Sequence, residues 1–287
     1  MDYLYNVADL NIKCKIPFPI NIQEESFEFI RTFKGDDLGI DFNYEILEVD
    51  ELPSIFDNSH NEGSRIYSEN DNRFFIHFCP SPGEEPYACV IWEKGSKVVK
   101  CMYLHGKEEY LNYSRNILNH AGLENFLNLS DGLLMHASFI EWNNKAILFS
   151  GPSGIGKSTQ AGLWIEYEGA NLINGDRAAV RLVDGVWNAY GLPYAGSSGV
   201  YKNQSVPLKA IVVLQKDSIN SIEKLDAVSA IKYLYPEITI HRWDKTFVSE
   251  NWEHCMKLLS QIPVYKLRCR IDKEAVEVLK KELIKDW

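Results

Sequence analysis

The 287-residue chain has no run of about 18 apolar residues, the length that an apolar helix needs to cross a bilayer, so we expect no membrane-spanning segment. Its first residues, Met-Asp-Tyr-Leu-Tyr, lack the basic and apolar stretches of a secretory signal peptide, and none is expected. Positive charge is also scarce, since 30 Lys and Arg stand against 40 Asp and Glu. The net charge of −10 provides no general basic face, so we expect neither nucleic acid nor a membrane as a partner.

Cysteine and histidine patterns that bind metals are missing as well. The six cysteines include no C-x-x-C pair, and the seven histidines show no metal-ligand spacing, so zinc is not expected. Scattered cysteines in a chain of this length are typical of reduced thiols, which indicates a cytoplasmic protein. The 45% apolar and 24% charged residues are the shares of an ordinary globular protein that can bury a core.

Short alternating segments separated by turn residues occupy the first part of the chain. They favour an antiparallel, half-buried sheet over residues 1–105, followed by a helix over residues 113–127. We therefore predict that residues 1–130 form a smaller antiparallel β-rich lobe with a connecting helix. The expected strands lie at residues 11–16 and 41–49, in two runs around a turn at 69–72, and in a hairpin of 87–92 with 97–103.

From Gly132 the pattern changes to strands alternating with helices. An apolar strand over 146–149 leads into a glycine-rich loop, and a helix should run from Lys157 to about Tyr167, ending at Gly169. A further core strand is expected at 210–214. Helices are expected at 227–234, 251–259 and 273–284. This alternation predicts an α/β domain over residues 131–287, with a mixed sheet and flanking helices.

The glycine-rich loop is a complete Walker A sequence, Gly151-Pro-Ser-Gly-Ile-Gly-Lys-Ser158. Its glycines permit the backbone to aim several N–H groups at one anion, and the following helix adds its positive N-terminal dipole. Lys157 supplies charge for the β- and γ-phosphates, and Ser158 offers a hydroxyl to Mg²⁺. We predict that the loop binds a nucleoside triphosphate. The expected binding residues are Gly151, Ser153, Gly154, Ile155, Gly156, Lys157, Ser158 and Thr159.

Several other classes of phosphate-loop protein fit the sequence poorly. A GTPase needs a guanine-reading Asn-Lys-x-Asp, and Asn144-Lys145 precedes the loop and lacks the Asp. The signature of a transport ATPase is missing, and simple metabolite kinases carry this loop near their first residues. Residues 210–217 look like a Walker B strand ending in Asp217, but a central core strand with a charged exit accounts for them equally well.

Three ordered features resemble the HPr serine kinase/phosphorylase family, whose P-loop fold is carboxykinase-like. They are Met135-His136-Ala137, the Walker A loop, and the segment from Glu168 to Arg177. The tail of residues 262–269 is similar to the branch of peptide serine kinases found with lasso-peptide and related clusters. The resemblance covers roughly the second half of the chain. It implies ATP and Mg²⁺ as cofactors and a serine on a peptide or small protein as acceptor.

The resemblance also implies roles for individual residues. Asp176 would bind Mg²⁺ together with Ser158 and would accept the proton of the attacking hydroxyl, tasks that the family divides between two aspartates. The first of that pair is Gly175 in this chain. Either Asp176 performs both tasks, or a carboxylate elsewhere performs one. His136 would contact the γ-phosphate or orient the acidic residue, and Arg177 would contact phosphate or form a surface ion pair.

The catalytic residues expected from this reasoning are Asp176, Lys157 and His136. The loop Gly196-Ser197-Ser198, with Lys202 and Asn203 as weaker candidates, lines the acceptor side or is simply a turn. The predicted function is an ATP-dependent kinase acting on a serine hydroxyl. The alternatives are a small-molecule kinase and a non-catalytic nucleotide sensor. GTP or pyrophosphate as donor and a homo-oligomeric assembly both stay open.

Overall fold

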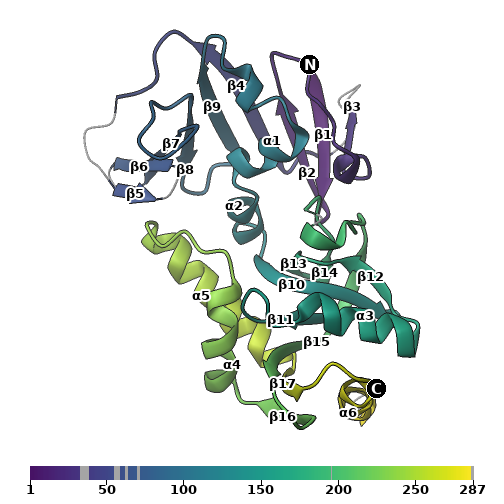
Figure 1. Cartoon of the computed structure of the whole chain (residues 1–287). Helices are drawn as coiled ribbons and strands as arrows, with labels where there is room; N and C mark the ends of the chain where they lie inside the picture. The colour runs from purple at the N-terminus through teal and green to yellow at the C-terminus, as the bar shows by residue number, and fades with distance from the viewer. Residues whose placement is uncertain (33–38, 55–58, 62–63, 70–71, 195, 286–287) are drawn as a thin grey trace. The chain divides into compact units, whose positions relative to one another are not determined.

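The computed structural model describes residues 1–32, 39–54, 59–61, 64–69, 72–194 and 196–285 (Figure 1). The chain divides into two compact units, Met1–Phe126 and Leu127–Trp287. Among the helices formed by these residues, none has the length and apolar character to cross a membrane.

A nine-stranded sheet forms most of the N-terminal unit. Its strands are β1 (Asp2–Val7), β2 (Leu10–Lys15), β3 (Ile30–Thr32), β4 (Phe42–Val49), β5 (Ser59–Asn61), β6 (Ser64–Glu69), β7 (Arg73–Phe78), β8 (Ala88–Glu93) and β9 (Val98–Leu104). Their order across the sheet is β3-β1-β2-β4-β9-β8-β7-β6-β5. The predicted antiparallel sheet is wrong at β4, which runs parallel to both β2 and β9. After β2 the chain forms β3 at the edge of the sheet before it returns to form β4 beside β2. Because no tight hairpin joins β2 to β4, the two strands are not forced to pair antiparallel.

The predicted hairpin of β8 and β9 is confirmed as an antiparallel pair. The N–H of Ser96 donates to the carbonyl of Glu93 across the turn (3.0 Å). Strands β6 and β7 likewise pair antiparallel where two runs were expected, while residues 70–71 of their predicted turn lie outside the described residues.

The predicted helix over residues 113–127 is two helices, α1 (Ser114–Ala121) and α2 (Leu123–Asn128). Gly122 separates them in the left-handed region (φ 71°), and its N–H donates to the carbonyl of Leu118 (3.1 Å). This is the usual glycine end of a helix, so the chain changes direction there. Two short 3₁₀ segments complete the unit, η1 (Glu24–Ser26) and η2 (Glu108–Tyr110).

An eight-stranded mixed sheet forms the centre of the C-terminal unit. Its strands are β10 (Gly132–Trp142), β11 (Lys145–Ser150), β12 (Asn171–Asn174), β13 (Arg177–Val183), β14 (Val186–Tyr190), β15 (Ser205–Lys216), β16 (Ser221–Leu225) and β17 (Val264–Cys269). The long strands β10 and β15 each pair with different neighbours along their two halves. Strands β11, β15 and β17 run parallel, so their carboxyl ends meet at one edge.

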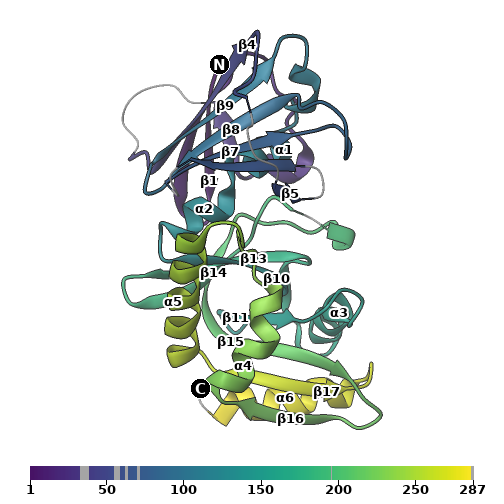
Figure 2. The same cartoon turned by 90° about the vertical axis from the view of Figure 1, so that its left-hand side faces the viewer.

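Helices cover both faces of this sheet (Figures 1 and 2). On one face, α3 (Lys157–Glu168) and α6 (Lys273–Lys285) bury Trp164 and Leu279 against it. On the other, α4 (Ala227–Leu234) and α5 (Lys245–Gln261) bury Leu234 and Leu258. Neighbouring residues of β11 and β15 alternate between these two cores, as a strand buried on both faces requires. The predicted α/β class is confirmed.

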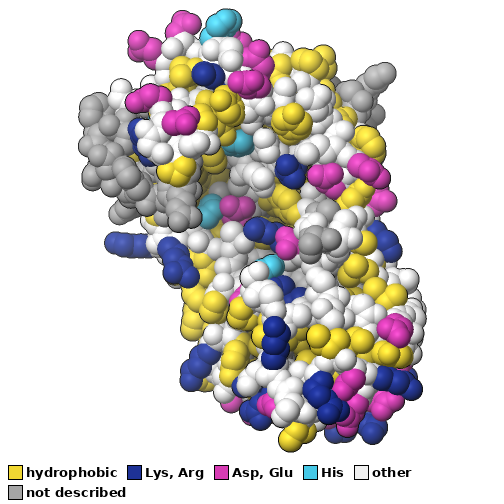
Figure 3. Space-filling model, in the orientation of Figure 1, with side chains coloured by type: hydrophobic (Ala, Val, Ile, Leu, Met, Phe, Trp, Pro, Cys, Tyr) yellow, Lys and Arg dark blue, Asp and Glu magenta, His cyan; other side chains and the backbone are white. Residues whose placement is uncertain are grey.

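Charged side chains of both signs are interspersed over the face of the C-terminal unit shown in Figure 3. Lys and Arg side chains there lie among Asp and Glu rather than gathering into one basic field. Elsewhere among the described residues of this unit, Arg270 pairs at the surface with Asp272 and Glu274 (both 2.8 Å). Exposed pairs of this kind contribute little to stability because water screens them.

His120 of α1 is a buried, neutral histidine in the N-terminal unit. Its Nδ1–H donates to the carbonyl of Asn116 (2.6 Å), and its Nε2 accepts from the hydroxyl of Tyr87 (2.8 Å). The ring of Phe78 packs against it, with centroids 4.3 Å apart. Burial lowers the pKa of His120 from 6.5 to about 4.

We predict that acid destabilises the N-terminal unit through His120. Between pH 6.5 and 4 this ring is protonated in the unfolded state but not in the folded state. The free energy of unfolding therefore falls as the pH drops through that window. The loss is at most about 3 kcal/mol. Denaturant unfolding at several pH values should show a flatter acid dependence for His120→Phe than for the wild type. Identical acid dependence in the two proteins would contradict the assignment.

Candidate functional site

The glycine-rich loop joins the carboxyl end of β11 directly to the first turn of α3. Gly151, Gly154 and Gly156 adopt positive φ values of 138°, 75° and 116°, which side chains other than glycine rarely tolerate. Ser153 is exposed, and the side chain of Ile155 lies in contact with the position a Cβ at Gly151 would take (3.4 Å). The loop therefore lies at the amino end of α3, and the amino end of a helix favours an anion.

Lys157 is the first residue of α3, and only 7% of it is exposed. Its Nζ donates to the carbonyls of Gly151 (2.7 Å) and Pro152 (3.3 Å). Removal from water lowers the pKa of Lys157, while the negative charges of Glu237 and Asp176 act in the opposite direction. The ammonium thus lies in the field of two carboxylates from different parts of the chain.

A buried amide fixes the turn that carries Asp176. Asn174 is 0% exposed, and its Nδ2 donates to the carbonyls of Leu192 (2.8 Å) and Tyr194 (3.0 Å). Its Oδ1 accepts from the N–H groups of Asp176 (2.9 Å) and Arg177 (3.0 Å). All the hydrogen-bonding capacity of one buried side chain is used to hold this turn, so the position of Asp176 is fixed.

His136 of β10 lies between two carboxylates. Its Nε2 is 3.6 Å from Oδ1 of Asp176, and its Nδ1 is 3.2 Å from Oε2 of Glu237. The backbone explains the first approach, because His136 pairs with Arg177 in the register of β10 with β13, and Ala137 N–H donates to the carbonyl of Asp176 (3.0 Å). Residues far apart in sequence therefore meet beside Lys157.

Glu237 is the site residue that the sequence did not indicate. It ends a single 3₁₀ turn, η4 (Tyr235–Glu237), after α4. Thr239 N–H donates to the carbonyl of Leu134 (2.9 Å), and Ile238 bridges Met135 on β10. This pairing brings the carboxylate to His136, and only 10% of the Glu237 side chain is exposed. A single glutamate after a helix has no local pattern that predicts such a position.

The glycine at position 175 is required by its neighbour. A Cβ on Gly175 would lie 2.1 Å from Oγ and 2.4 Å from Cβ of Ser198, in the 3₁₀ turn η3 (Gly196–Ser198). A Cβ on Gly196 would lie 2.5 Å from Cβ of Asp176. The η3 turn therefore packs directly on the Asp176 turn, and Ser198 occupies the space that an acidic side chain at 175 would need.

The remaining predicted residues divide into two groups. Ser158 contacts the Asp176 turn, since its Oγ donates to the carbonyl of Gly175 (3.4 Å). The Arg177 guanidinium lies 3.8 Å from Asp176 and above the ring of Tyr194 (5.9 Å). Ser158 and Arg177 therefore both contact the Asp176 turn, and Thr159 is exposed next to Ser158. By contrast, the backbone carbonyl of Lys202 lies against Gly191, 2.0 Å from the position a Cβ there would take.

A cavity of about 290 Å³ opens beside the loop, at the carboxyl ends of the parallel strands β11, β15 and β17. Ligands in α/β sheets bind at this edge. The apolar part of the lining comes from Ile155, Leu214 and Ile271, and the polar part includes Gln160, Asp217 and Arg270. Asp217, assigned from sequence to the exit of a core strand, lies here, and its carboxylate accepts from Ser218 N–H (2.7 Å).

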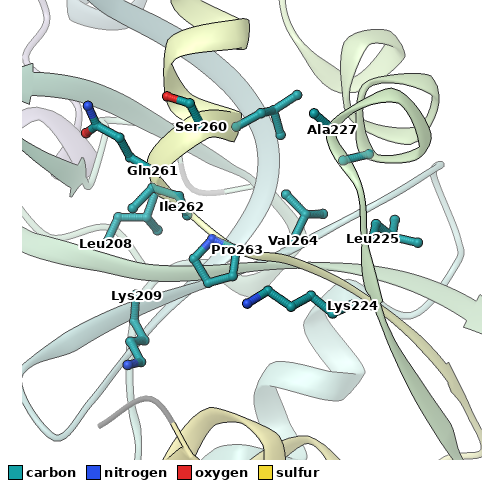
Figure 4. A pocket seen from close by; sticks show the side chains of 12 residues that line it. Leu208, Lys209, Lys224, Leu225, Ala227, Ser260, Gln261, Ile262, Pro263 and Val264 are labelled. Carbon is teal, nitrogen blue, oxygen red and sulfur yellow. The ribbon is translucent and has the colours of Figure 1, made fainter.

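A second cavity, of about 550 Å³, lies at the opposite ends of β15 and β17 (Figure 4). The residues that line it include Leu208, Leu225 and Ile262 together with Lys209 and Lys224. None of the residues predicted to bind phosphate or metal lines it, so we do not assign the nucleotide to this cavity.

A family model described as SynChlorMet cassette protein ScmC matches residues 121–285, more than half of the chain. The chain belongs to this family. A solved structure of the Hpr(Ser) kinase/phosphatase from Coxiella burnetii is similar at 13% identity and a TM-score of 0.31, over 53% of this chain and 97% of that one. No curated protein matches the chain. So distant a structural likeness decides nothing about chemistry, and the activity of this ScmC-family chain has to be inferred from its own site.

The donors at this site fit a magnesium ion bound together with phosphate. Within the residues that the structure describes, no group of three or more His, Cys, Asp or Glu gathers as a metal cluster. The available oxygens are the Ser158 hydroxyl and the Asp176 carboxylate, whose side chain is 35% exposed. Magnesium takes hard oxygen ligands and commonly uses only one or two carboxylates beside substrate phosphates.

We predict that Gly175→Ala destabilises the C-terminal unit by about 1–3 kcal/mol, because the added methyl overlaps Ser198. Adding Ser198→Gly should recover part of the loss. Gly162→Ala is the matched control, since the same methyl at this exposed position of α3 meets nothing within 4 Å. Thermal unfolding measures all three variants. Equal midpoints for Gly175→Ala and Gly162→Ala would exclude the tight packing.

Proposed function

We propose that this protein is an ATP-dependent kinase that transfers the γ-phosphoryl group to the hydroxyl of a serine in a peptide or small protein. The observation that carries the proposal is the position of Lys157. Lys157 is buried at the first position of the helix after a Walker A loop, and the negative charges of Glu237 and Asp176 act on its ammonium and favour its charged form. An anion-binding loop opposite an acidic group is what phosphoryl transfer requires, since it depends on positioning and charge neutralisation.

The nucleotide has a place in this arrangement. The amides of residues 151–158 and the Lys157 ammonium would hold the triphosphate. The 290 Å³ cavity continues from Gly154 and Gly156, so we propose that the base and ribose enter it. Ser158 and Asp176 would hold Mg²⁺, which supplies charge neutralisation on the phosphate oxygens when bound.

The serine acceptor rests on the resemblance of residues 133–180 and 262–269 to the peptide serine kinases. His136, with 36% of its side chain exposed, and Asp176 are open to an acceptor hydroxyl. All six cysteines are free thiols, which agrees with a reaction in the cytoplasm. The rival is a nucleotide sensor that binds ATP without transferring phosphate.

The test is phosphoryl transfer from γ-labelled ATP to a degenerate library of serine peptides. We expect transfer by the wild type and a loss of about 10²–10³-fold in Lys157→Ala, because one preorganised charge is removed. Asp176→Asn should bind ATP and lose transfer. Lys281→Ala, an exposed position of α6, serves as control and should match the wild type. ATP binding without any labelled peptide would contradict the peptide kinase and favour the sensor or a small-molecule kinase.

We further predict that Thr159→Trp weakens ATP binding about tenfold or more and leaves pyrophosphate binding unchanged. Thr159 is exposed and lines the cavity beside the loop, so a large ring there obstructs a nucleoside but not a diphosphate. Glu166→Trp, on an exposed part of the same helix, is the control. Calorimetric titration with both ligands gives the comparison. Unchanged ATP affinity would place the base elsewhere.

A further inference from the structure

We propose that Gln160 recognises the base of the nucleotide, with its side-chain amide bonding the edge of adenine that carries a ring nitrogen beside the amino group. This inference rests on the proposed ATP-dependent function and deepens it, because it names the residue that distinguishes ATP from GTP. Gln160 lies one turn after Lys157 on the buried face of α3, and only 3% of it is exposed. Its side chain lines the 290 Å³ cavity beside the phosphate loop.

Gln160 occupies a helix face on which apolar residues are expected. Its neighbours on that face, Ala161 and Trp164, belong to the core on this side of the sheet. Within the part of the chain that the structure describes, Nε2 of Gln160 has no hydrogen-bond partner. A buried donor without a partner destabilises the folded state, and native proteins rarely keep one. A ligand in the adjoining cavity can supply the acceptor that this amide lacks.

The amide of Gln160 lies at the wall of the cavity. Its Oε1 is 4.0 Å from Sγ of Cys269, at the end of β17, and Cys269 lines the same cavity. A thiol is only a weak donor, so Oε1 keeps capacity to accept a second bond, while Nε2 keeps its protons for a ligand. The amide therefore offers one donor and one acceptor side by side.

Adenine carries the complementary pair. Its amino group donates, the neighbouring ring nitrogen accepts, and a glutamine amide makes both bonds at once. On the edge that includes N7, guanine has a carbonyl oxygen in place of the amino group, which would meet Oε1 with a second acceptor. Among the described residues that line the cavity, the only carboxylate that could bind the donors of guanine is Asp217, and its Oδ1 accepts from Ser218 N–H (2.7 Å). Leu214 and Ile271 supply apolar lining that suits the faces of a purine ring.

Calorimetric titration of Gln160→Met with ATP, GTP and pyrophosphate tests this recognition. Methionine is unbranched like glutamine and has no amide. We expect the wild type to bind ATP about tenfold or more tightly than GTP, and Gln160→Met to lose most of that preference through weaker ATP binding. Pyrophosphate affinity should not change. Gln261→Met, the same substitution at the exposed end of α5, is the matched control and should keep the wild-type preference.

Thermal unfolding without nucleotide separates recognition of a base from a structural role. Gln160→Met removes a buried donor that has no partner, so its midpoint should equal or exceed that of the wild type. A midpoint well below the wild type would show that the amide is needed for folding, and would contradict the inference. A wild type without preference for ATP, or a preference that survives in Gln160→Met, would overturn it, since water alone would then satisfy the amide.

Cys269 provides a second measurement of where the base lies. Cys79 and Cys269 are partly exposed free thiols, whereas the other four cysteines are buried. Burial raises the pKa of both thiols, so their alkylation by N-ethylmaleimide is followed at mildly alkaline pH. Peptide mass spectrometry then gives the labelling rate of each, with Cys79 of the N-terminal unit as the internal control.

ATP should protect Cys269 alone. At about ten times the Kd, ATP leaves roughly one site in ten free, so we expect labelling of Cys269 to slow about tenfold and labelling of Cys79 to stay unchanged. Pyrophosphate should protect neither thiol. Equal labelling of Cys269 with and without bound ATP would overturn the position of the base beside Gln160. These measurements need binding alone, so a protein that passes them and transfers no phosphate would end the kinase proposal and leave the role of Gln160 intact.

Discussion

Lys157 is only 7% exposed, so the charge of its ammonium has to be compensated by groups of the protein. The Lys157 ammonium bonds the loop carbonyls of Gly151 and Pro152, and the negative charges of Asp176 and Glu237 act on it from a longer distance. Burial weakens the charged form, and the two carboxylates support it. When a polyanion reaches Lys157, its oxygens can replace the loop carbonyls as partners of the ammonium. The loop is therefore suited to bind phosphate.

The two carboxylates are held by different means. Asp176 lies on a turn that the buried amide of Asn174 ties to residues 192 and 194, and the close approach of Gly196 leaves it little room to move. Glu237 depends on a short backbone pairing with β10. His136 lies between them, 3.6 Å from Asp176 and 3.2 Å from Glu237. Gly175, which departs from the resembling family, packs so closely on Ser198 that a larger side chain would overlap it.

Sequence reasoning succeeded where the determinants are local. The loop between β11 and α3, the end of α3 at Gly169 and the span of α4 all follow from glycine, apolar periodicity and N-cap chemistry. Long-range pairing was harder: β4 lies parallel between β2 and β9, and no local pattern specifies strand direction. The position of Glu237 could not be predicted for the same reason, because its partner, His136, lies on a strand far earlier in the chain. The prediction that one site contains His136, Lys157 and Asp176 came from the family resemblance, not from periodicity.

A crystal structure with a non-hydrolysable ATP analogue and Mg²⁺ tests the central claim most directly. The account predicts the triphosphate against the amides of residues 151–158, the metal between Ser158 and Asp176, and the base in the cavity lined by Leu214 and Ile271. Density for the analogue away from the loop, or a metal held without Asp176, would contradict it.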